Sequence, residues 1–160
     1  MQLTLAHIGS RNSGGAKSRR AATGSKDPAE AWMHTYIERT SAYAHCQSEE
    51  FRSVDAFWEW AARQQGRTQL CAVLLDSRGK LLSSEAFADW IGERRDSGTQ
   101  HMVLAIGPAD GWSDTDRKQA TLLLSLGPMT LAHTLARVVL AEQVYRAFTI
   151  LAGHPYHGGH

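Results

Sequence analysis

Three mainly apolar runs constrain the fold of this chain more than any other feature of its sequence. They cover residues 70–75, 101–106 and 121–126. A strand that is covered on both faces is a continuous apolar run, whereas a strand with one exposed face alternates apolar and polar residues. Helical patterns separate the runs, so the sequence predicts an α/β domain with a mainly parallel sheet flanked by helices.

The other elements follow from helix caps and from the spacing of apolar residues. Residues 3–8 form a short apolar run ended by Gly9, which is typical of a strand. Asp27 and Pro28 favour a helix start, because aspartate caps free backbone N–H groups and proline suits the first helical position. The remaining predictions are helices over 29–41, 53–65, 83–94 and 113–120 and a short strand over 43–46.

The longest predicted helix covers 135–151, a stretch without glycine or proline. Thr130 or Thr134 can cap its start, and Gly153 stands where helices commonly end in a left-handed residue. Two apolar stripes run along this helix, although a surface helix needs only one. They are formed by Leu140, Val144, Ala147, Phe148 and Leu151, and by Leu135, Val139 and Ile150. We therefore expect the second side to meet another element or a second subunit.

Charged residues on the same helix also need partners. Glu142 and Arg146 are four residues apart in the favourable order for a helical ion pair. Arg137 projects from the apolar face, where an unpaired charge is costly. We therefore expect Arg137 to have a buried partner in the chain, or a carboxylate or carbonyl of a neighbouring subunit.

Composition and cysteine usage limit the compartment and the partners. Of the 160 residues, 42% are apolar and 21% are charged, which is typical of a single soluble domain over 1–160. The net charge of +1 is too small to attract nucleic acid to the protein as a whole, so any RNA contact must come from a local basic patch. Cys46 and Cys71 lack the paired spacing of a disulfide framework or zinc site. No signal-peptide pattern is seen, and no apolar run approaches the ~20 residues of a membrane span. We expect a cytoplasmic protein without membrane segment or metal.

The last part of the chain carries a long and specific motif. It has the pattern HxLxRVxLxEQxYRAxxIxxxxPYH from His133 to His157, and the segments LLD-S-RGK, SSEAFADWI and VLAIGPADGWS precede it. Together these segments closely resemble the RlmH (YbeA) family over about residues 70–157. Members of that family are small SPOUT-class methyltransferases that methylate N3 of a pseudouridine in large-subunit ribosomal RNA.

The turns after the three buried strands are a natural ligand site, because open α/β sheets bind ligands at the carboxyl ends of their strands. The resemblance implies more: a C-terminal trefoil knot whose loops hold S-adenosylmethionine, with S-adenosylhomocysteine as the product. By matching position, the implied cofactor contacts are Leu75, Gly107, Leu126, Gly127, Pro128, Met129, Thr130 and Leu131. The chain departs from the family at Pro108, where a second glycine is usual, and at Gly127, where serine is usual.

The implied reaction is displacement of the sulfonium methyl group by a ring nitrogen that carries a weakly acidic proton. The enzyme must help remove this proton and stabilise charge on the neighbouring carbonyl oxygens. The resemblance assigns His157 as base or relay, Tyr156 as hydrogen-bond donor or stacking ring, and Arg146 as the cation facing the developing charge. His133 is assigned a structural or substrate-contacting role. Gly158 stands where the family commonly has a basic residue.

The segment 9–28 is rich in Gly, Ser and Ala and carries five basic residues, which predicts a mobile basic loop. It is either a solvated surface loop or an arm that contacts RNA phosphates. Part of it, GSRNSGGAKS, looks like a damaged nucleotide-binding P-loop. That motif needs glycine directly before lysine, and here Ala16 separates Gly15 from Lys17, so the nucleotide-hydrolase interpretation is not favoured.

The leading hypothesis is a cytoplasmic, metal-independent methyltransferase that acts as a homodimer on large-subunit ribosomal RNA within the assembled ribosome. The resemblance suggests that its site is completed by both subunits. Its rival is a non-catalytic RNA- or ribosome-binding dimer that keeps the fold, motivated by the three departures from the family. A metal cluster is a third interpretation. It is not favoured, because no fixed element and no nearby carboxylate supports the three histidines that would form it, His154, His157 and His160.

Overall fold

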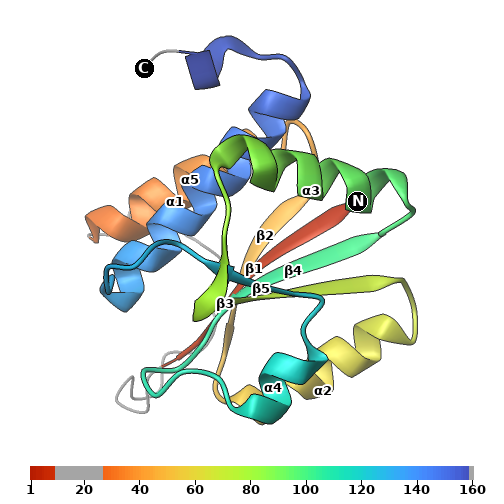
Figure 1. Cartoon of the computed structure of the whole chain (residues 1–160), viewed down its shortest axis with the longest axis vertical. Helices are drawn as coiled ribbons and strands as arrows, with labels where there is room; N and C mark the ends of the chain where they lie inside the picture. The colour runs from red at the N-terminus through yellow and green to blue at the C-terminus, as the bar shows by residue number, and fades with distance from the viewer. Residues whose placement is uncertain (10–26, 159–160) are drawn as a thin grey trace.

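The structure, a computed structural model, describes residues 1–9 and 27–158 (Figure 1). Its centre is a sheet that has, within the described residues, five strands in the order β2-β1-β4-β3-β5. The strands are β1 (Gln2–Ile8), β2 (Cys46–Phe51), β3 (Leu70–Leu81), β4 (His101–Ile106) and β5 (Leu122–Ser125). All neighbouring pairs are parallel, which confirms the predicted class. The predicted basic loop at 9–28 falls almost entirely outside the described residues.

Helices cover both faces of the sheet, as Figure 1 shows. One face carries α1 (Pro28–Thr40), α3 (Ser84–Asp96) and α5 (His133–Leu151), and the other carries α2 (Val54–Gln65) and α4 (Asp114–Gln119). An apolar core lies on each side. Val73 and Leu104 point into the first core, whereas Leu74 and Ala105 point into the second. Because residues 70–75 of β3 and 102–106 of β4 are covered on both faces, their sequences are continuously apolar.

Side-chain caps confirm two predicted helix starts directly. The Asp27 carboxylate accepts a hydrogen bond from the backbone N–H of Ala29 at 3.0 Å, at the start of α1. Ser113 caps α4 and exchanges hydrogen bonds with Asp116, which forms a complete capping box. These caps place the helix starts within a residue of the positions that the sequence predicts.

The start of α5 differs from the prediction. The helix begins at His133 after Ala132, and no side chain within the described residues caps it. Thr134 lies inside the helix and Thr130 lies in the preceding loop, so the prediction that either threonine caps it is wrong. The other end is as predicted, since Gly153 ends the helix with a φ of 65°.

The second strand is also displaced from its predicted position. The sequence predicts it at 43–46, whereas β2 runs from Cys46 to Phe51. Among the strands of residues 1–9 and 27–158 it pairs with β1 alone, at the edge of the sheet, and more and less buried residues alternate along it. Tyr43 lies in the turn before it, and its ring packs on Tyr145 and Phe148 of α5 at 6.4 Å between centroids.

The end of β3 is more unusual. The sequence predicts a turn at 77–80, but the strand continues to Leu81 with a break in register, so that Leu75 and Lys80 both pair with Leu124. A Cβ atom added to Gly79 would lie 2.6 Å from the carbonyl carbons of Leu123 and Leu124. The extension of β3 therefore touches the backbone of β5 directly. The trefoil knot stays a prediction.

Candidate functional site

Most of the predicted cofactor contacts lie at one edge of the sheet. β3 lies between β4 and β5, and Leu75 pairs with Ile106 on one side and with Leu124 on the other. Gly107 follows Ile106 directly, and the segment 126–131 follows β5. The first predicted turn is a break in the register of β3 after Leu75 rather than the end of the strand, and it lies at the edge where β4 and β5 end. The structure therefore brings together this first turn and the turns after β4 and β5, as the sequence predicts for a ligand site.

A tryptophan that the sequence analysis did not single out joins two of these turns. The indole N–H of Trp112 donates a hydrogen bond to the carbonyl oxygen of Leu75 at 3.0 Å. The ring also covers Gly107, since a Cβ atom there would lie 2.9 Å from indole atoms. Gly107 is thus required by the packing of Trp112, and its role in cofactor binding stays a prediction. The sequence pattern that could have indicated this contact is a tryptophan a few residues after the glycine that ends a buried strand.

The first turn is held by charged groups as well. Asp76 follows Leu75, and its side chain is only 4% exposed. The Arg117 guanidinium of α4 donates to its carboxylate at 2.8 Å, and the backbone N–H of Arg78 donates to its other oxygen at 2.8 Å. Arg117 also pairs with Asp114 at 2.9 Å. This network fixes the first turn on α4.

The third turn is more open. The Ser125 hydroxyl bonds both the N–H and the carbonyl oxygen of Gly127 at 3.2 Å. Gly127 has a φ of 131°, and a Cβ atom there would meet no protein atom within 4 Å. Pro128 and Thr130 are exposed, and Met129 is 79% exposed. A flat ligand can therefore approach this backbone, and the residues fit a nucleoside-bearing cofactor.

The predicted catalytic residues Arg146 and Tyr156 lie together near the C-terminal end of the chain, Arg146 on α5 and Tyr156 on the short 3₁₀ helix that follows it. Arg146 donates to one carboxylate oxygen of Glu142 from Nη2 at 2.6 Å and from Nε at 3.0 Å, and the Tyr156 hydroxyl donates to the same oxygen at 3.2 Å. The guanidinium lies 5.1 Å from the centre of the Tyr156 ring. The predicted pair of Glu142 and Arg146 is therefore confirmed.

The chemistry of Tyr156 follows from its surroundings. Burial and a hydrogen bond with Tyr36 hold the pKa of the Tyr156 phenol well above its ordinary value, and Glu142 acts in the same direction. The phenol is therefore neutral and can donate a hydrogen bond. His157 belongs to the short 3₁₀ helix η1 (Pro155–Gly158), but its side chain lies outside the described residues.

Within one chain, these residues are far from the three turns. α5 begins directly after the turn at 126–131, and its last residue, Leu151, lies beside Met1 at the opposite edge of the sheet. About 20 Å of helix separates His133 from Arg146. Figure 1 shows η1 at the far end of α5 from the turns. The candidate catalytic residues and the candidate cofactor contacts therefore form two separate groups in a single chain.

A third group lies where α5 begins. The rings of His7 and His133 meet edge-on at 5.7 Å, and His133 hydrogen-bonds the backbone of Gly107. Burial, together with the nearby Arg137 cation, lowers the pKa of His7 to about 4. Arg137 pairs with Glu30 of α1 at 2.7 Å, which confirms that it has a partner in the chain.

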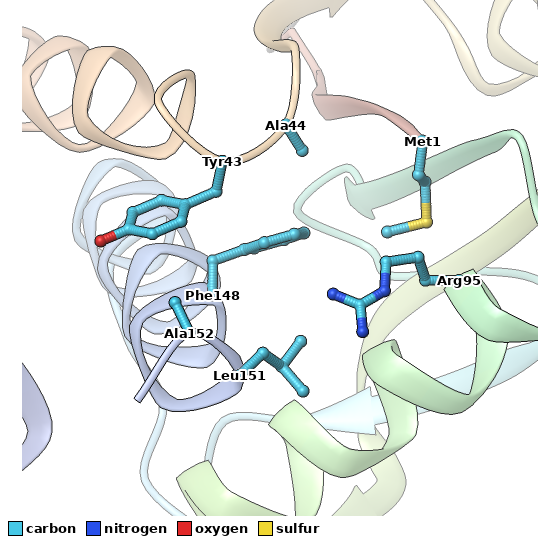
Figure 2. Close-up of a pocket in the computed structure, with 7 residues that line it drawn as sticks. All are labelled: Met1, Tyr43, Ala44, Arg95, Phe148, Leu151 and Ala152. Atoms are coloured by element: carbon cyan, nitrogen blue, oxygen red, sulfur yellow. The ribbon is translucent and has the colours of Figure 1, made fainter. Parts of the chain in front are cut away.

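A cavity of about 140 Å³ lies at the opposite edge of the sheet. Figure 2 shows the side chains that line it. Arg95 and the last turn of α5 line it, together with Met1. The cavity contains none of the predicted site residues. Across residues 1–9 and 27–158, no helix is long and apolar enough to cross a membrane, and no group of three His, Cys, Asp or Glu side chains could hold a metal ion.

Solved structures with a similar fold include known methyltransferases. The chain is similar to the SpoU methyltransferase AviRb from Streptomyces viridochromogenes, solved in complex with the cofactor AdoMet, with a TM-score of 0.50 and 14% identity over 95% of this chain and 61% of that one. It is also similar to a probable methylase family protein from Haemophilus influenzae Rd KW20, with a TM-score of 0.55 and 8% identity over 96% and 69% of the two chains. At these identities the likeness concerns the fold alone.

Sequence comparisons are more specific. A family model described as "Predicted SPOUT methyltransferase" matches residues 20–157. The ribosomal RNA large subunit methyltransferase H of Koribacter versatilis is 50% identical over 125 residues, which is 78% of this chain and 85% of the relative. The protein of the same name from Brucella anthropi is 56% identical over 85 residues, about half the length of each. As its C-terminal motif predicts, the chain therefore belongs to the SPOUT methyltransferase family and, within it, to the RlmH family.

Proposed function

We propose that the protein is an S-adenosylmethionine-dependent methyltransferase that methylates N3 of a pseudouridine in large-subunit ribosomal RNA. It works in the cytoplasm, on the assembled ribosome, with the whole chain forming one domain. Support comes from the names of its relatives and from the AdoMet complex of AviRb. The observation that carries the proposal is the gathering of Leu75, Gly107 and the segment 126–131 at one edge of the sheet.

S-adenosylmethionine, when bound, supplies a methyl group on a positively charged sulfur and leaves as S-adenosylhomocysteine. The chain must orient the target base and remove the proton from its ring nitrogen. Tyr156 is suited to donate a hydrogen bond, because its phenol stays protonated. Arg146 is suited to stabilise negative charge on a base carbonyl, and Glu142 holds both groups in place. The proton acceptor in this proposal is His157.

The working unit in this proposal is a homodimer. The candidate catalytic residues and the cofactor turns lie at opposite ends of α5, so a second copy in the reverse direction is needed to bring them together. Apolar side chains on the outer face of α1 and α5 support such a contact, since Trp32 is 56% and Leu135 is 50% exposed. Val139 and Ile150, on the second apolar stripe, are only half-buried within the chain.

Two experiments test the proposed function. Calorimetry with S-adenosylmethionine separates it from the non-catalytic rival, because the rival requires no binding even at millimolar cofactor. Mass spectrometry of ribosomal RNA from cells that lack the gene tests the target. We expect one methyl group to be missing, restored by the wild-type copy and not by His157→Ala. If the RNA were fully methylated in cells without the gene, the proposal would fail.

A further inference from the structure

We propose that Trp112 is the positioning residue of the cofactor site. Its indole group holds the first turn, at the register break of β3, and the turn after β4 at a fixed separation, so that S-adenosylmethionine binds to a preformed part of the site. The inference rests on the proposed function, because it concerns the same site, but it assigns a role to a residue that contacts the cofactor only through the turns it supports.

The geometry joins the two turns through a single ring. Trp112 is 3% exposed, so its indole N–H must find a protein acceptor, and it donates to the Leu75 carbonyl oxygen at 3.0 Å. The same ring lies against Gly107 so closely that an added Cβ would stand 2.9 Å from Cε2 and Nε1. Leu75 and Gly107 are both implied cofactor contacts, and they come from neighbouring strands. Movement of the indole would therefore displace both.

The indole itself is held firmly. Its ring packs on Phe57 of α2, with 5.8 Å between the ring centroids. Gly111, directly before it, adopts a φ of 79°, a conformation that glycine adopts without strain. Ser113, directly after it, is the N-cap of α4 and forms the capping box. Trp112 is thus fixed from both sides along the chain and from the core beneath.

A second contact from α4 supports the same turn. Asp76 follows Leu75, and its buried carboxylate pairs with Arg117 at 2.8 Å. The first turn is therefore tied to Trp112 through the backbone of Leu75 and to α4 through the side chain of Asp76. These contacts are all made between groups of the protein itself, so the ordering cost on binding is small at this half of the site.

The turn after β5 provides a contrast. Its side chains at Pro128, Met129 and Thr130 are exposed, and the hydroxyl of Ser125 bonds the backbone of Gly127. The site therefore has a rigid half, set by Trp112, and an open half. A change that displaces Leu75 or Gly107 should therefore weaken cofactor binding, because the exposed turn after β5 cannot restore the contacts that these two residues make.

Trp112→Phe tests this role, because it keeps an aromatic ring and removes the indole N–H. We expect S-adenosylmethionine to bind about 5- to 10-fold more weakly in calorimetry, as for the loss of one hydrogen bond. The KM for S-adenosylmethionine should rise by the same factor, with kcat at saturation within twofold of wild type. The matched control is Trp58→Phe, which also loses an indole hydrogen bond on this face of the sheet, to Asp116 at 2.7 Å. It should bind S-adenosylmethionine within twofold of wild type.

Comparison of the two tryptophan variants distinguishes a positioning role from a purely structural one. A positioning role predicts similar losses of thermal stability in the two variants but weaker binding only in Trp112→Phe. Equal binding in the two variants would overturn the inference, whether both are weakened or neither is. Absence of binding by the wild-type protein would instead refute the proposed function and the inference with it. If Trp112→Phe does not fold, Trp112→Leu is compared with Trp58→Leu by the same criterion, because both changes also remove an indole N–H.

Discussion

Gly79→Ala should be among the most damaging single changes in this protein. The new Cβ would lie 2.6 Å from the carbonyl carbons of Leu123 and Leu124 and 2.7 Å from the oxygen of Leu123. These atoms are all backbone, so no side-chain rotation relieves the contact. The extension of β3 must instead move away from β5, which breaks the pairing of Lys80 with Leu124.

The size of the effect follows from the shift required. Ordinary contact begins near 3.4 Å, so the two backbones must separate by about 0.8 Å. Overpacking in a well-packed region typically costs about 1–3 kcal/mol, and a backbone obstacle places this site at the upper end. A loss of about 3 kcal/mol lowers the ratio of folded to unfolded protein roughly 150-fold. For a domain of this size it lowers Tm by about 6–12 °C.

Urea unfolding followed by circular dichroism measures this loss. The control is Gly66→Ala at the end of α2, where φ is −69° and the nearest atoms to a new Cβ are 3.7 Å away. That change should leave stability unaltered or raise it by up to about 1 kcal/mol. If Gly79→Ala unfolded within about 1 kcal/mol of wild type, the close approach of β3 to β5 would be refuted.

Three further predictions concern catalysis, pH and assembly. Arg146→Met should lower methyl transfer to ribosomes at least about 100-fold, while calorimetry shows S-adenosylmethionine binding within twofold; loss of binding would place Arg146 at the turns instead. Because burial and Arg137 lower the pKa of His7 to about 4, the unfolded chain binds more protons between pH 4 and 6.5, so stability should rise with pH in that window. The difference between the urea unfolding midpoints at pH 4.5 and pH 7 should be smaller in His7→Gln than in the wild-type protein. An unchanged difference would exclude His7 as the cause of the pH dependence of stability. In sedimentation, Leu135→Asp should yield a monomer and Leu81→Asp, on β3, a dimer; a dimer in both would exclude the α5 face.

The buried strands were predictable because their burial appears in the sequence without knowledge of their neighbours. β4 matches its predicted range, 101–106, and β5 differs only at its ends. β2 was misplaced, because an edge strand with alternating polar residues resembles a loop until its partner β1 is known. The extension of β3 was missed for a similar reason: a sequence that contains Gly79 suggests a turn, and only the tertiary structure shows why glycine is needed there.

The candidate site was predictable in its parts but not in its arrangement. Leu75 and Gly107 were expected at the same sheet edge and are found there. Trp112 was not singled out, because the hydrogen bond to Leu75 joins residues 37 positions apart in the chain. The resemblance implies a site completed by both subunits, but the distance between Tyr156 and the turns within one chain was not foreseen. The two regions are close in the motif, but a long straight helix carries the chain away from one to the other.

The candidate catalytic residues and the cofactor turns lie at opposite ends of α5, so the activity of the protein should depend on its own concentration. Under the proposed function, each copy carries a donor half and an acceptor half that cannot serve each other. Specific activity should then fall on dilution below the dimer dissociation constant, even though every molecule remains folded. A mixture of two inactive variants, one damaged in each half, should recover part of the activity by pairing their intact halves.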